Sequence, residues 1–348
     1  MTVSGDSLGT FFSTHQSALL AKRTWVRIIA NGMAIVWVLL LLLTAELTLR
    51  AYHQHRMRKT LPLELRAETR ALTWDDIKDK YRIVCFGDSI TFGEDLPYAQ
   101  TYPAMLARLL EQKSADPDVV VINSGIRGHT SVQGLARLER DVLWYKPHVV
   151  LIAFGINDGK LGYWPLDPIR ERAMSGHSLR TQAAELLHHS HLCRTLCART
   201  RRMLRRLGWQ EPAVETRTEH GPQPRVSRQG FEIAQRRLAS RIRSSDHATL
   251  LLMTTTPVTE AFTDGQGPAQ YRRQLAVYGE YNQVVKDVAA QHGACVIDLY
   301  NAFTGRPQSE LASLLAEDGV HLTAEGEHLV ATNVWQALQG TAPTVRPA

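Results

Sequence analysis

The stretch RIVCFGDSITFG, residues 82–93, decides the predicted fold of the chain. Its first five residues are mostly β-branched or apolar, and a Gly-Asp-Ser turn at residues 87–89 ends that run. A buried strand that ends at such a turn and continues as a helix presents a serine hydroxyl at the carboxyl edge of a parallel sheet. Ser89 is therefore a candidate nucleophile, and the alternative is an ordinary helix-capping or turn serine.

The same strand pattern recurs along the chain. Short apolar or β-branched runs that end at Gly, Asn or Asp lie at 82–86, 119–123, 149–154, 249–255 and 294–298. Helical patterns alternate with them, at 101–112, 132–144, 229–244, 271–292 and 324–338. Strands that are buried on both faces and alternate with helices are typical of a parallel sheet between two helical layers. We therefore expect an α/β fold, a three-layer α/β/α sandwich with a five-stranded parallel sheet.

An apolar segment precedes this region. Residues 28–45 are apolar apart from Asn31, and they include five consecutive leucines, Leu39 to Leu43. This is about the length of 18–20 residues that a membrane-spanning helix needs. A cleaved signal peptide is the alternative, but its apolar core is usually shorter, and no small-x-small cleavage site follows here. We expect an uncleaved transmembrane anchor at residues 28–47.

The alternation of strands and helices is interrupted between the third and fourth strands, at residues 159–228. This insertion contains helical stretches, one of them rich in arginine, and a loop with Pro and Gly. Because it follows the carboxyl end of a strand, where ligands bind, we expect either a lid or membrane-facing cap or a peripheral helical addition. The predicted segments are a polar N-terminal segment at 1–27, the anchor at 28–47, a juxtamembrane linker at 48–80, the domain at 81–340 and a tail at 341–348.

The formal net charge of +6 raises the question of nucleic-acid binding. The basic residues are concentrated at 50–59 and 194–206, with few aromatic residues between them on which bases would stack. We therefore expect no nucleic-acid partner. These two regions are interpreted as solvated helix faces or as a surface for anionic lipid.

The cysteines do not indicate a disulfide framework, because there are only four in a chain of 348 residues. Cys85 and Cys295 fall in predicted buried strands, where a thiol acts as a small apolar side chain. Cys193 and Cys197 lie one helical turn apart, and the His and Cys residues at 188–193 have no second group of ligands at a recognisable spacing. We expect no metal site.

Four polar stretches follow predicted strands or precede the last helix. They are the serine turn at 87–89, NSGIRG at 123–128, GIND at 155–158 and DGVH at 318–321. In a doubly wound sheet such loops converge on one edge, so stretches that are far apart in sequence can form one pocket.

Each stretch offers a group that acyl transfer needs. The Ser89 hydroxyl is a poor nucleophile until a base takes its proton, and His321 is the candidate base, with Asp318 three residues earlier to hold its ring. The oxyanion that forms needs donors, and the candidates are the N–H groups of Ser89 and Gly125 and the side-chain amide of Asn157. Each residue alone is a common turn or capping residue, so the prediction depends on their joint occurrence.

The four stretches resemble the sequence blocks of the SGNH (GDSL-type) hydrolase superfamily of esterases, lipases and acyltransferases. The matching segments are FGDSITFG at 86–93, NSGIRGHTS at 123–131, GIND at 155–158 and DGVHLTAEG at 318–326. Ile90 stands where leucine is commoner in the family. The resemblance spans about residues 80–340.

The resemblance implies a flavodoxin-like domain with Ser89 as the nucleophile and His321 as the base, aided by Asp318. It also implies that Gly125 and Asn157 complete the oxyanion hole and that no metal ion or organic cofactor takes part. An anchor followed by such a domain is similar to bacterial envelope proteins. This implies a single-pass inner-membrane protein with a periplasmic catalytic domain.

We therefore expect a serine-dependent ester hydrolase that acts through a covalent acyl-Ser89 intermediate, with deacetylation of an O-acylated glycan as one form. The expected substrate is an acylated small molecule, glycan or lipid. One alternative is an O-acyltransferase that modifies an envelope polysaccharide, and a second is a catalytically silent envelope protein that binds a glycan. Ser89 has no Gly-x-Ser-x-Gly elbow around it, and residues 87–93 lack the lysine of a phosphate-binding loop.

Overall fold

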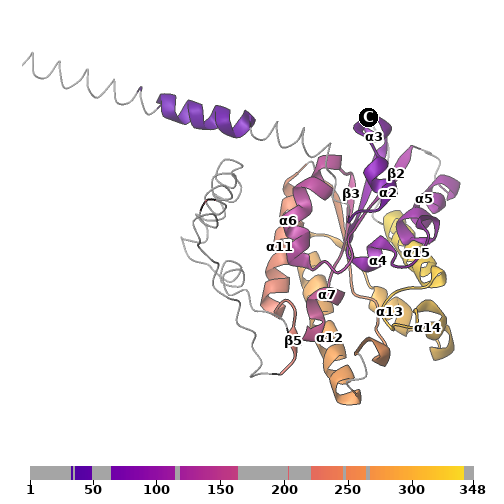
Figure 1. Ribbon diagram of the computed structural model, residues 1–348. Helices are drawn as coiled ribbons and strands as arrows, with labels where there is room; N and C mark the ends of the chain where they lie inside the picture. Colours follow the sequence, from indigo (N-terminus) through magenta and orange to yellow (C-terminus); the bar gives the residue numbers. More distant parts are fainter. Residues whose placement is uncertain are drawn as a thin grey trace, which may run out of the picture. The chain divides into compact units, whose positions relative to one another are not determined.

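Figure 1 shows the computed structural model of the chain, which describes residues 33, 36–48, 64–113, 118–163, 203, 221–245, 248–263 and 267–340. The chain divides into two compact units, one made of residues 1–56 and 182–210 and the other of residues 57–181 and 211–348. The second unit contains the sheet and all four polar stretches.

The described part of the first unit includes a helix over residues 36–48, and the leucines at 39–43 are exposed. Among the described residues, no helix combines the length and the apolar character that crossing a membrane requires. Residues 28–32 and 34–35 of the predicted anchor lie outside the described residues. The transmembrane anchor is therefore not confirmed and stays a prediction.

The sheet of the second unit has the predicted five strands, and all of them are parallel. They are β1 (Tyr81–Gly87), β2 (Val119–Gly125), β3 (Val149–Ala153), β6 (Thr249–Met253) and β7 (Cys295–Ile297). Their order, β2-β1-β3-β6-β7, is that of a flavodoxin-like sheet. The order reverses at β1, so the carboxyl ends of β1 and β3 mark the position where ligands bind in such sheets.

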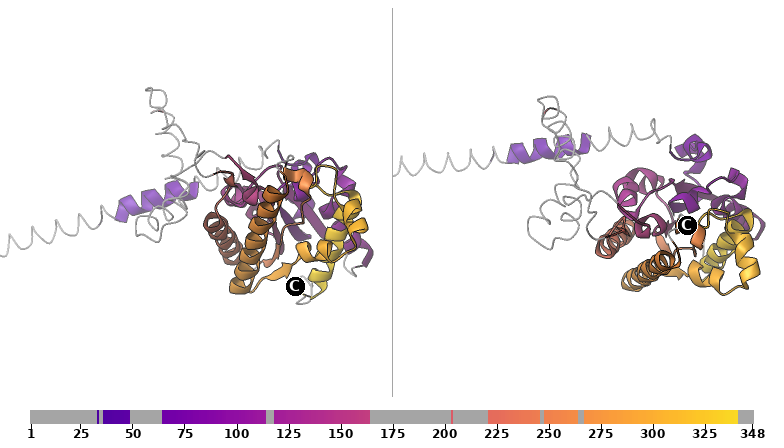
Figure 2. Two further views of the ribbon diagram at one scale, coloured as in Figure 1. Left: turned by 90° about the horizontal axis from the view of Figure 1, so that it is seen from below. Right: turned by 60° about the horizontal axis from the view of Figure 1, so that its bottom comes forward.

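Helices cover both faces of the sheet (Figures 1 and 2). One layer consists of α6 (Ser131–Asp141), α11 (Arg228–Ser244) and α12 (Pro268–His292), and the opposite layer has α5 (Tyr102–Lys113) and α15 (Ala324–Gly340). Shorter helices are α13 (Leu299–Thr304), α14 (Gln308–Leu314) and the 3₁₀ turns η1 (Tyr98–Gln100), η2 (Leu143–Tyr145) and η3 (Glu260–Thr263). The predicted three-layer α/β/α sandwich is confirmed.

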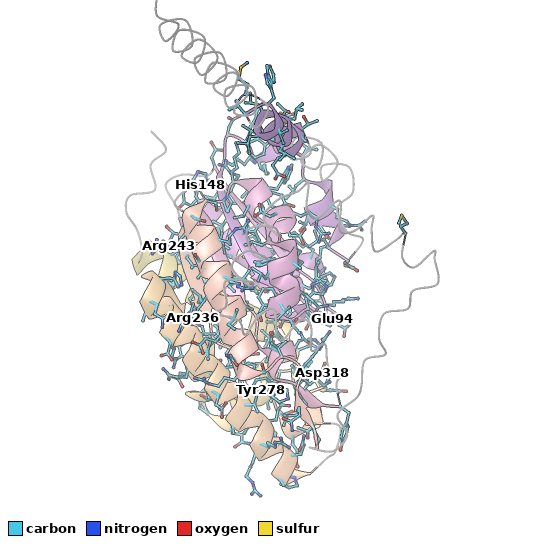
Figure 3. The ribbon with its side chains drawn as sticks, turned by 90° about the vertical axis from the view of Figure 1, so that its left-hand side faces the viewer. Glu94, His148, Arg236, Arg243, Tyr278 and Asp318 are labelled. Carbon is cyan, nitrogen blue, oxygen red and sulfur yellow. The ribbon has the colours of Figure 1, made fainter. Side chains whose placement is uncertain are left out.

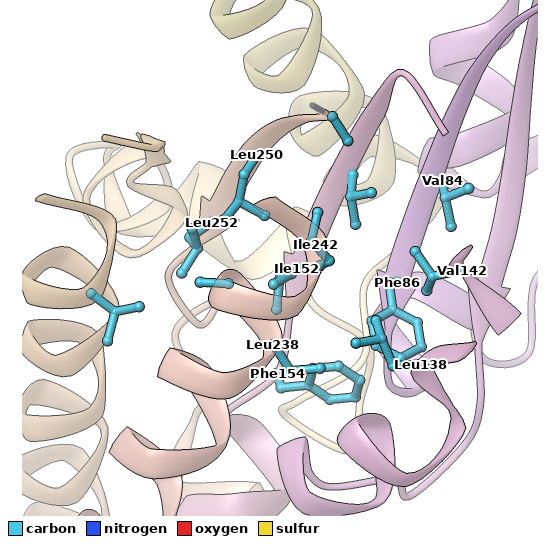
Figure 4. Close-up of a cluster of buried hydrophobic side chains, with 14 of the residues drawn as sticks. Val84, Phe86, Leu138, Val142, Ile152, Phe154, Leu238, Ile242, Leu250 and Leu252 are labelled. Carbon is cyan, nitrogen blue, oxygen red and sulfur yellow. The ribbon is translucent and has the colours of Figure 1, made fainter. Parts of the chain in front are cut away.

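The core divides according to the two-residue period of the strands. In β1, Val84 and Phe86 pack on the face that α6 and α11 cover, as Figure 4 shows, whereas Ile83 and Cys85 pack on the face toward α5 and α15. All four side chains are buried. Burial on both faces explains why the strand is a continuous apolar run, without polar alternation.

The domain begins before its first strand. The sequence placed residues 64–80 in a polar linker with a helix-compatible stretch at 63–72. In the structure α2 (Ala67–Ala71) and α3 (Trp74–Ile77) form there, and Leu65, Thr69 and Ile77 are buried. The Thr69 hydroxyl donates to the Asn123 carbonyl at 2.7 Å, at the end of β2. The predicted boundary at residue 81 is therefore too late, because this segment packs against the sheet.

Of the predicted insertion at 159–228, the structure describes the two ends, residues 159–163 and 221–228, and the single residue Met203. There β4 (Leu161–Gly162) and β5 (Gln223–Pro224) pair as a short antiparallel ladder, and the Arg225 N–H donates to the Lys160 carbonyl at 3.2 Å. The insertion thus leaves and re-enters the domain at one place, directly after the GIND stretch. The remainder, with Cys193 and Cys197, lies outside the described residues.

Candidate active site

The loop after β1 places Ser89 at the start of α4 (Ser89–Phe92). Asp88 is the N-cap residue of this helix, and its side chain accepts the Ile90 N–H at 3.1 Å. Asp88 therefore holds the turn, as a capping carboxylate does. Ser89 is buried, with 6% of its surface exposed, and its own N–H belongs to the first turn, where no helical carbonyl is in reach. Gly93, with φ of 74°, ends the helix in the left-handed conformation.

Ser89 and His321 meet at the carboxyl edge of the sheet, since His321 Nε2 lies 3.0 Å from Ser89 Oγ. On the other side of the ring, His321 Nδ1 contacts Asp318 Oδ2. The second carboxylate oxygen, Asp318 Oδ1, accepts the N–H groups of Val320 at 3.1 Å and His321 at 3.0 Å. The Asp-x-x-His spacing thus forms a closed turn that aims the imidazole at the serine.

The charge of Asp318 is stabilised by the same turn. Partial burial raises the pKa of this carboxyl, but the two backbone N–H donors and the His321 ring outweigh that effect and hold the pKa below its ordinary value. The carboxylate stays ionised at neutral pH. It can therefore orient the neutral imidazole and stabilise the imidazolium that forms when His321 takes a proton.

The predicted oxyanion donors lie in different surroundings. Asn157, in α7 (Ile156–Gly159), lines the same pocket as Ser89, and its Nδ2 atom lies 3.3 Å from Asp88 Oδ2. Gly125 ends β2 and packs on α4, where a Cβ atom would lie 2.2 Å from the Phe92 nitrogen.

The sequence predicted an open N–H at Gly125, but in the structure this group donates to Asn123 Oδ1 at 3.0 Å. The residues that line the pocket include Ser89 and Asn157 and do not include Gly125. The structure therefore brings Ser89, Asn157, Asp318 and His321 into one pocket, and it gives Gly125 a packing role beside it. An oxyanion donor at Gly125 stays a prediction.

The pocket has a volume of about 330 Å³. Its lining consists of Ser89, Glu94, Arg127, Gly128, Ile156, Asn157, Lys160, Phe262, Asp318, Val320 and His321. In Figure 3 Glu94 and Asp318 lie below His148, which precedes β3. The pocket therefore lies at the edge of the sheet that the sequence predicted.

Buried polar groups behind the pocket hold its loops together. Asp158 accepts the Ser131 N–H at 2.9 Å and the Ser131 hydroxyl at 2.5 Å, which joins the GIND stretch to the loop after β2. Arg137 donates to the carbonyls of Gly87 at 2.7 Å and Ser124 at 2.9 Å, and its ion pair with Asp141 measures 3.0 Å. These contacts fasten the ends of β1, β2 and α7 to one another.

Burial changes the acidity of these carboxyls. It raises the pKa of Asp88 to about 6 and that of Asp158 to about 7, although hydrogen bonds from Ile90 and Ser131 oppose the shift. Glu327, which accepts the Tyr102 N–H at 2.6 Å, is also buried, and its pKa is well above the ordinary value. None of these three residues lines the pocket, so they support the loops.

Sequence reasoning missed several residues of the pocket. Glu94, Arg127, Lys160 and Phe262 line it, but none of them belongs to a recognisable spacing of catalytic groups. Arg127 lies inside the NSGIRG stretch and Lys160 is the second residue after GIND, so their positions in the predicted loops were a usable signal. Phe262 lies in η3, far from any of the four stretches, and had no such signal.

No group of three or more His, Cys, Asp and Glu side chains suited to hold a metal ion is found in the part of the chain that the structure describes. The His and Cys residues at 188–193 lie outside that part, so the expectation that they hold no metal stays a prediction.

Comparisons with known proteins add sequence similarity to this geometry. The profile of the GDSL-like Lipase/Acylhydrolase family matches residues 85–329. An arylesterase of Vibrio mimicus is 37% identical over 84 residues, which cover 24% of this chain and 41% of that protein. Esterase TesA of Pseudomonas aeruginosa is 34% identical over 105 residues, which cover 30% of this chain and 51% of that protein. The matches thus span about half or less of these relatives.

Among solved structures, a lipase/acylhydrolase from Enterococcus faecalis aligns with 76% of this chain and 99% of its own, at 22% identity and a TM-score of 0.49.

Proposed function

Because the chain belongs to the GDSL-like lipase and acylhydrolase family, we propose that it is a serine-dependent carboxylic ester hydrolase that acts through a covalent acyl-Ser89 intermediate. The observation that carries the proposal is the chain of contacts from Ser89 Oγ to His321 Nε2 at 3.0 Å and from His321 Nδ1 to Asp318. These two contacts join a nucleophile, a base and the carboxylate that orients the base.

In the first half of the reaction, His321 Nε2 takes the Ser89 proton while Oγ bonds to the ester carbonyl carbon. The oxyanion that results accepts the Ser89 N–H and the Asn157 amide, which lie at the same pocket. When the intermediate collapses, the imidazolium gives its proton to the leaving alkoxide. The acyl group stays on Ser89, and the alcohol departs.

In the second half, water takes the position of the alcohol. His321 removes one proton from it, the hydroxide bonds to the acyl carbon, and the Ser89 oxygen leaves and regains the proton. The products are a carboxylic acid and the free serine. If a sugar hydroxyl replaces the water, the same steps transfer the acyl group, so an O-acyltransferase for an envelope polysaccharide is the first alternative.

The acyl group is proposed to lie against the apolar part of the pocket. Ile156 and Val320 are buried and belong to one apolar cluster, and Phe262 packs against that cluster. A volume of about 330 Å³ is at the small end of ligand pockets. These observations support short acyl groups such as acetyl, and therefore the deacetylation of an O-acylated glycan as one form of the activity.

The test uses the full chain and p-nitrophenyl esters with acyl groups from acetyl to dodecanoyl. We expect hydrolysis that peaks at short acyl groups, with a loss of about a thousandfold or more in Ser89→Ala. A fluorophosphonate should label the wild-type protein at Ser89. Hydrolysis that is unchanged in Ser89→Ala would overturn the role of this residue.

The same assay separates the alternatives. An acyltransferase would move the acyl group to an added polysaccharide faster than to water. A catalytically silent glycan-binding protein would turn over no ester and take no label, yet bind an acylated glycan. We regard the silent protein as less well supported, because a binding pocket needs no contact between a serine and an Asp-supported histidine.

We also propose that residues 28–47 anchor the chain in the inner membrane, with the catalytic domain on the periplasmic side. The support is the apolar run in the sequence and the resemblance to envelope proteins. Alkaline phosphatase, a reporter that is active only in the periplasm, tests this when it is fused after Ala348. We expect phosphatase activity in cells, and an inactive fusion together with an active cytoplasmic reporter at the same position would reverse the proposed orientation.

A further inference from the structure

Arg127 is held at the wall of the pocket by two of its neighbours. Its Nε atom lies 2.8 Å from Glu94 Oε2, and its guanidinium carbon lies 4.4 Å from the centre of the Phe92 ring. Phe92 is the last residue of α4, the helix that begins at Ser89. The position of this guanidinium is therefore tied to the nucleophile loop.

The Phe92 ring is itself fixed by a second arginine. The guanidinium of Arg66 lies 4.5 Å from the ring centre and donates to the carbonyls of Phe92 at 2.6 Å, Gly93 at 2.5 Å and Leu96 at 2.8 Å. Three carbonyl acceptors leave Arg66 little freedom to move. Arg127 thus stacks on a ring that Arg66 also contacts, and this stacking reduces the side-chain entropy that Arg127 loses when it binds a ligand.

The hydrogen-bonding capacity of Arg127 is only partly used. Its Nε atom forms an ion pair with Glu94, and among the described residues its two terminal nitrogens donate no hydrogen bond. These carry four of the five N–H donors of a guanidinium. The Arg127 side chain is 55% exposed and lines the pocket, so a ligand in the pocket can reach these donors.

A second cation lines the same pocket from another loop. Lys160 follows α7, and its Nζ atom lies 4.7 Å from the centre of the Phe262 ring. The acidic side chains in the lining are Glu94 and Asp318, and each contacts a partner within the pocket, Arg127 and His321 respectively. The chemistry of the lining therefore divides into an apolar part, the catalytic groups and two cations.

We propose that this pocket selects esters whose alcohol part carries a carboxylate or a phosphate, and that Arg127, assisted by Lys160, binds that anion. The inference rests on the proposed ester hydrolysis and names its substrate class. A guanidinium presents paired N–H donors that match the two oxygens of a carboxylate or phosphate. Because the apolar residues of the lining suit the acyl group, the anion is assigned to the alcohol that leaves.

The test compares matched esters that differ only in the anion, with the acyl group that the p-nitrophenyl series favours. One pair is an acylated methyl uronoside and its neutral carboxamide, and the other is 1-acylglycerol 3-phosphate and 1-acylglycerol. The measured quantity is the ratio of kcat/KM for the anionic ester to that for the neutral ester, with the full chain. We expect a ratio above one in at least one pair.

Two variants should move this ratio in opposite directions. Arg127→Gln removes the cation and should lower the ratio about fivefold to twentyfold, since an ionic hydrogen bond at a half-exposed position is partly screened by solvent. Glu94→Gln removes the competing carboxylate and should raise the ratio about twofold to fivefold. If the Glu94 and Arg127 pair served only to hold the loop, both variants would reduce both rates and leave the ratio unchanged.

The matched control is Arg236→Gln. Arg236 is 44% exposed and forms an ion pair of 2.7 Å with Glu232 on α11, away from Glu94 in Figure 3. This variant should change neither rate. The ratio of the wild type should also fall as salt is raised from about 0.05 M to 0.5 M, because the Debye length shortens.

The outcomes are distinct. A preference in the sugar pair alone identifies a uronate, a preference in the glycerol pair alone identifies a phosphate, and a preference in both supports the anion class. Equal rates for anionic and neutral esters in both pairs, or a ratio that Arg127→Gln leaves unchanged, overturn the inference. Absence of turnover with every ester, p-nitrophenyl esters included, would instead overturn the proposed hydrolysis.

Discussion

His321 Nε2 lies 3.0 Å from Ser89 Oγ, although 232 residues separate the two in sequence. Ser89 follows β1 at the start of α4, and His321 lies in the turn that precedes α15. Parallel strands send their carboxyl ends to one edge of the sheet, so a loop after the first strand and a turn before the last helix can meet there. The contact is thus a consequence of the fold, and it requires no local sequence relationship.

The first prediction concerns the base. His321→Ala removes the acceptor of the Ser89 proton, so we expect kcat for a p-nitrophenyl ester to fall by about a thousandfold or more, with a small change in KM. Steady-state kinetics, together with circular dichroism to verify the fold, measures this. A loss below tenfold would place the base elsewhere.

The second prediction concerns Asp318. In Asp318→Asn the amide oxygen can still accept the Val320 and His321 N–H groups, so the turn should persist. The amide cannot accept from His321 Nδ1 as a carboxylate does, and the imidazole loses its orientation and the stabilisation of its charge. We expect kcat to fall about a hundredfold to ten thousandfold, with a small fall in thermal stability, because the ionised carboxylate that the turn stabilises is lost. If kcat stayed within threefold of wild type, Asp318 would be a turn residue only.

Much of the fold could be predicted from the sequence, because the patterns that indicate strands and turns are local. The five strands are short apolar runs, and Asp318 and His321 lie in one turn, so spacing alone indicated their contact. The contact between Asp158 and Ser131 could not be predicted in this way, since it depends on how α7 and α6 are placed after folding. The packing of residues 64–80 was missed for the same reason, because α2 and α3 are short and only their burial fixes them.

The Gly125 N–H shows a different limit of sequence reasoning. A glycine after β2 predicted that another group approaches its backbone N–H closely. The predicted group was the oxyanion of the reaction. In the structure the close neighbour is the backbone of α4, and Asn123 Oδ1 takes the N–H. Packing on α4 thus explains the need for a glycine, and an oxyanion donor at its N–H stays a prediction.

The third prediction follows from this packing. In Gly125→Ala the new Cβ would lie 2.2 Å from the Phe92 nitrogen and 2.6 Å from the Thr91 carbonyl carbon, so α4 must shift and carry Ser89 with it. We expect a loss of about 1–3 kcal/mol in the free energy of unfolding and a marked loss of kcat. Urea unfolding and ester hydrolysis measure the two effects.

Gly279→Ala is the matched control for that substitution. Gly279 lies within α12, and a Cβ atom there meets nothing within 4 Å. Alanine favours a helix over glycine, so this variant should be stabilised by about 0.5–1 kcal/mol and retain its activity. If both variants behaved alike, the α4 contact would not be the cause.

The fourth prediction concerns pH and stability. Asp158 has a pKa of about 7 in the folded chain, raised by burial from an ordinary value of 3.8. Between these two values the folded state binds more protons than the unfolded state, so stability falls as pH rises. The loss is complete only above the folded pKa of about 7. Relative to Asp158→Asn, whose amide does not titrate, the wild type should lose up to about 4 kcal/mol between pH 4 and pH 8.

Comparison of the two pH profiles isolates this ionisation. The amide of Asp158→Asn forms different hydrogen bonds with Ser131, but that change is independent of pH and displaces the whole profile by a constant. The difference in slope between the two proteins therefore reports mainly the proton of Asp158, with a smaller part from Asp88, whose charge raises the pKa of Asp158. Asp75→Asn, at a side chain that is 85% exposed, should reproduce the wild-type slope. The profiles are measured by urea unfolding from pH 4 to pH 8. Parallel profiles for the wild type and Asp158→Asn would show that Asp158 is ionised in the folded chain throughout this range. Its contact with Ser131 would then be an ordinary carboxylate hydrogen bond.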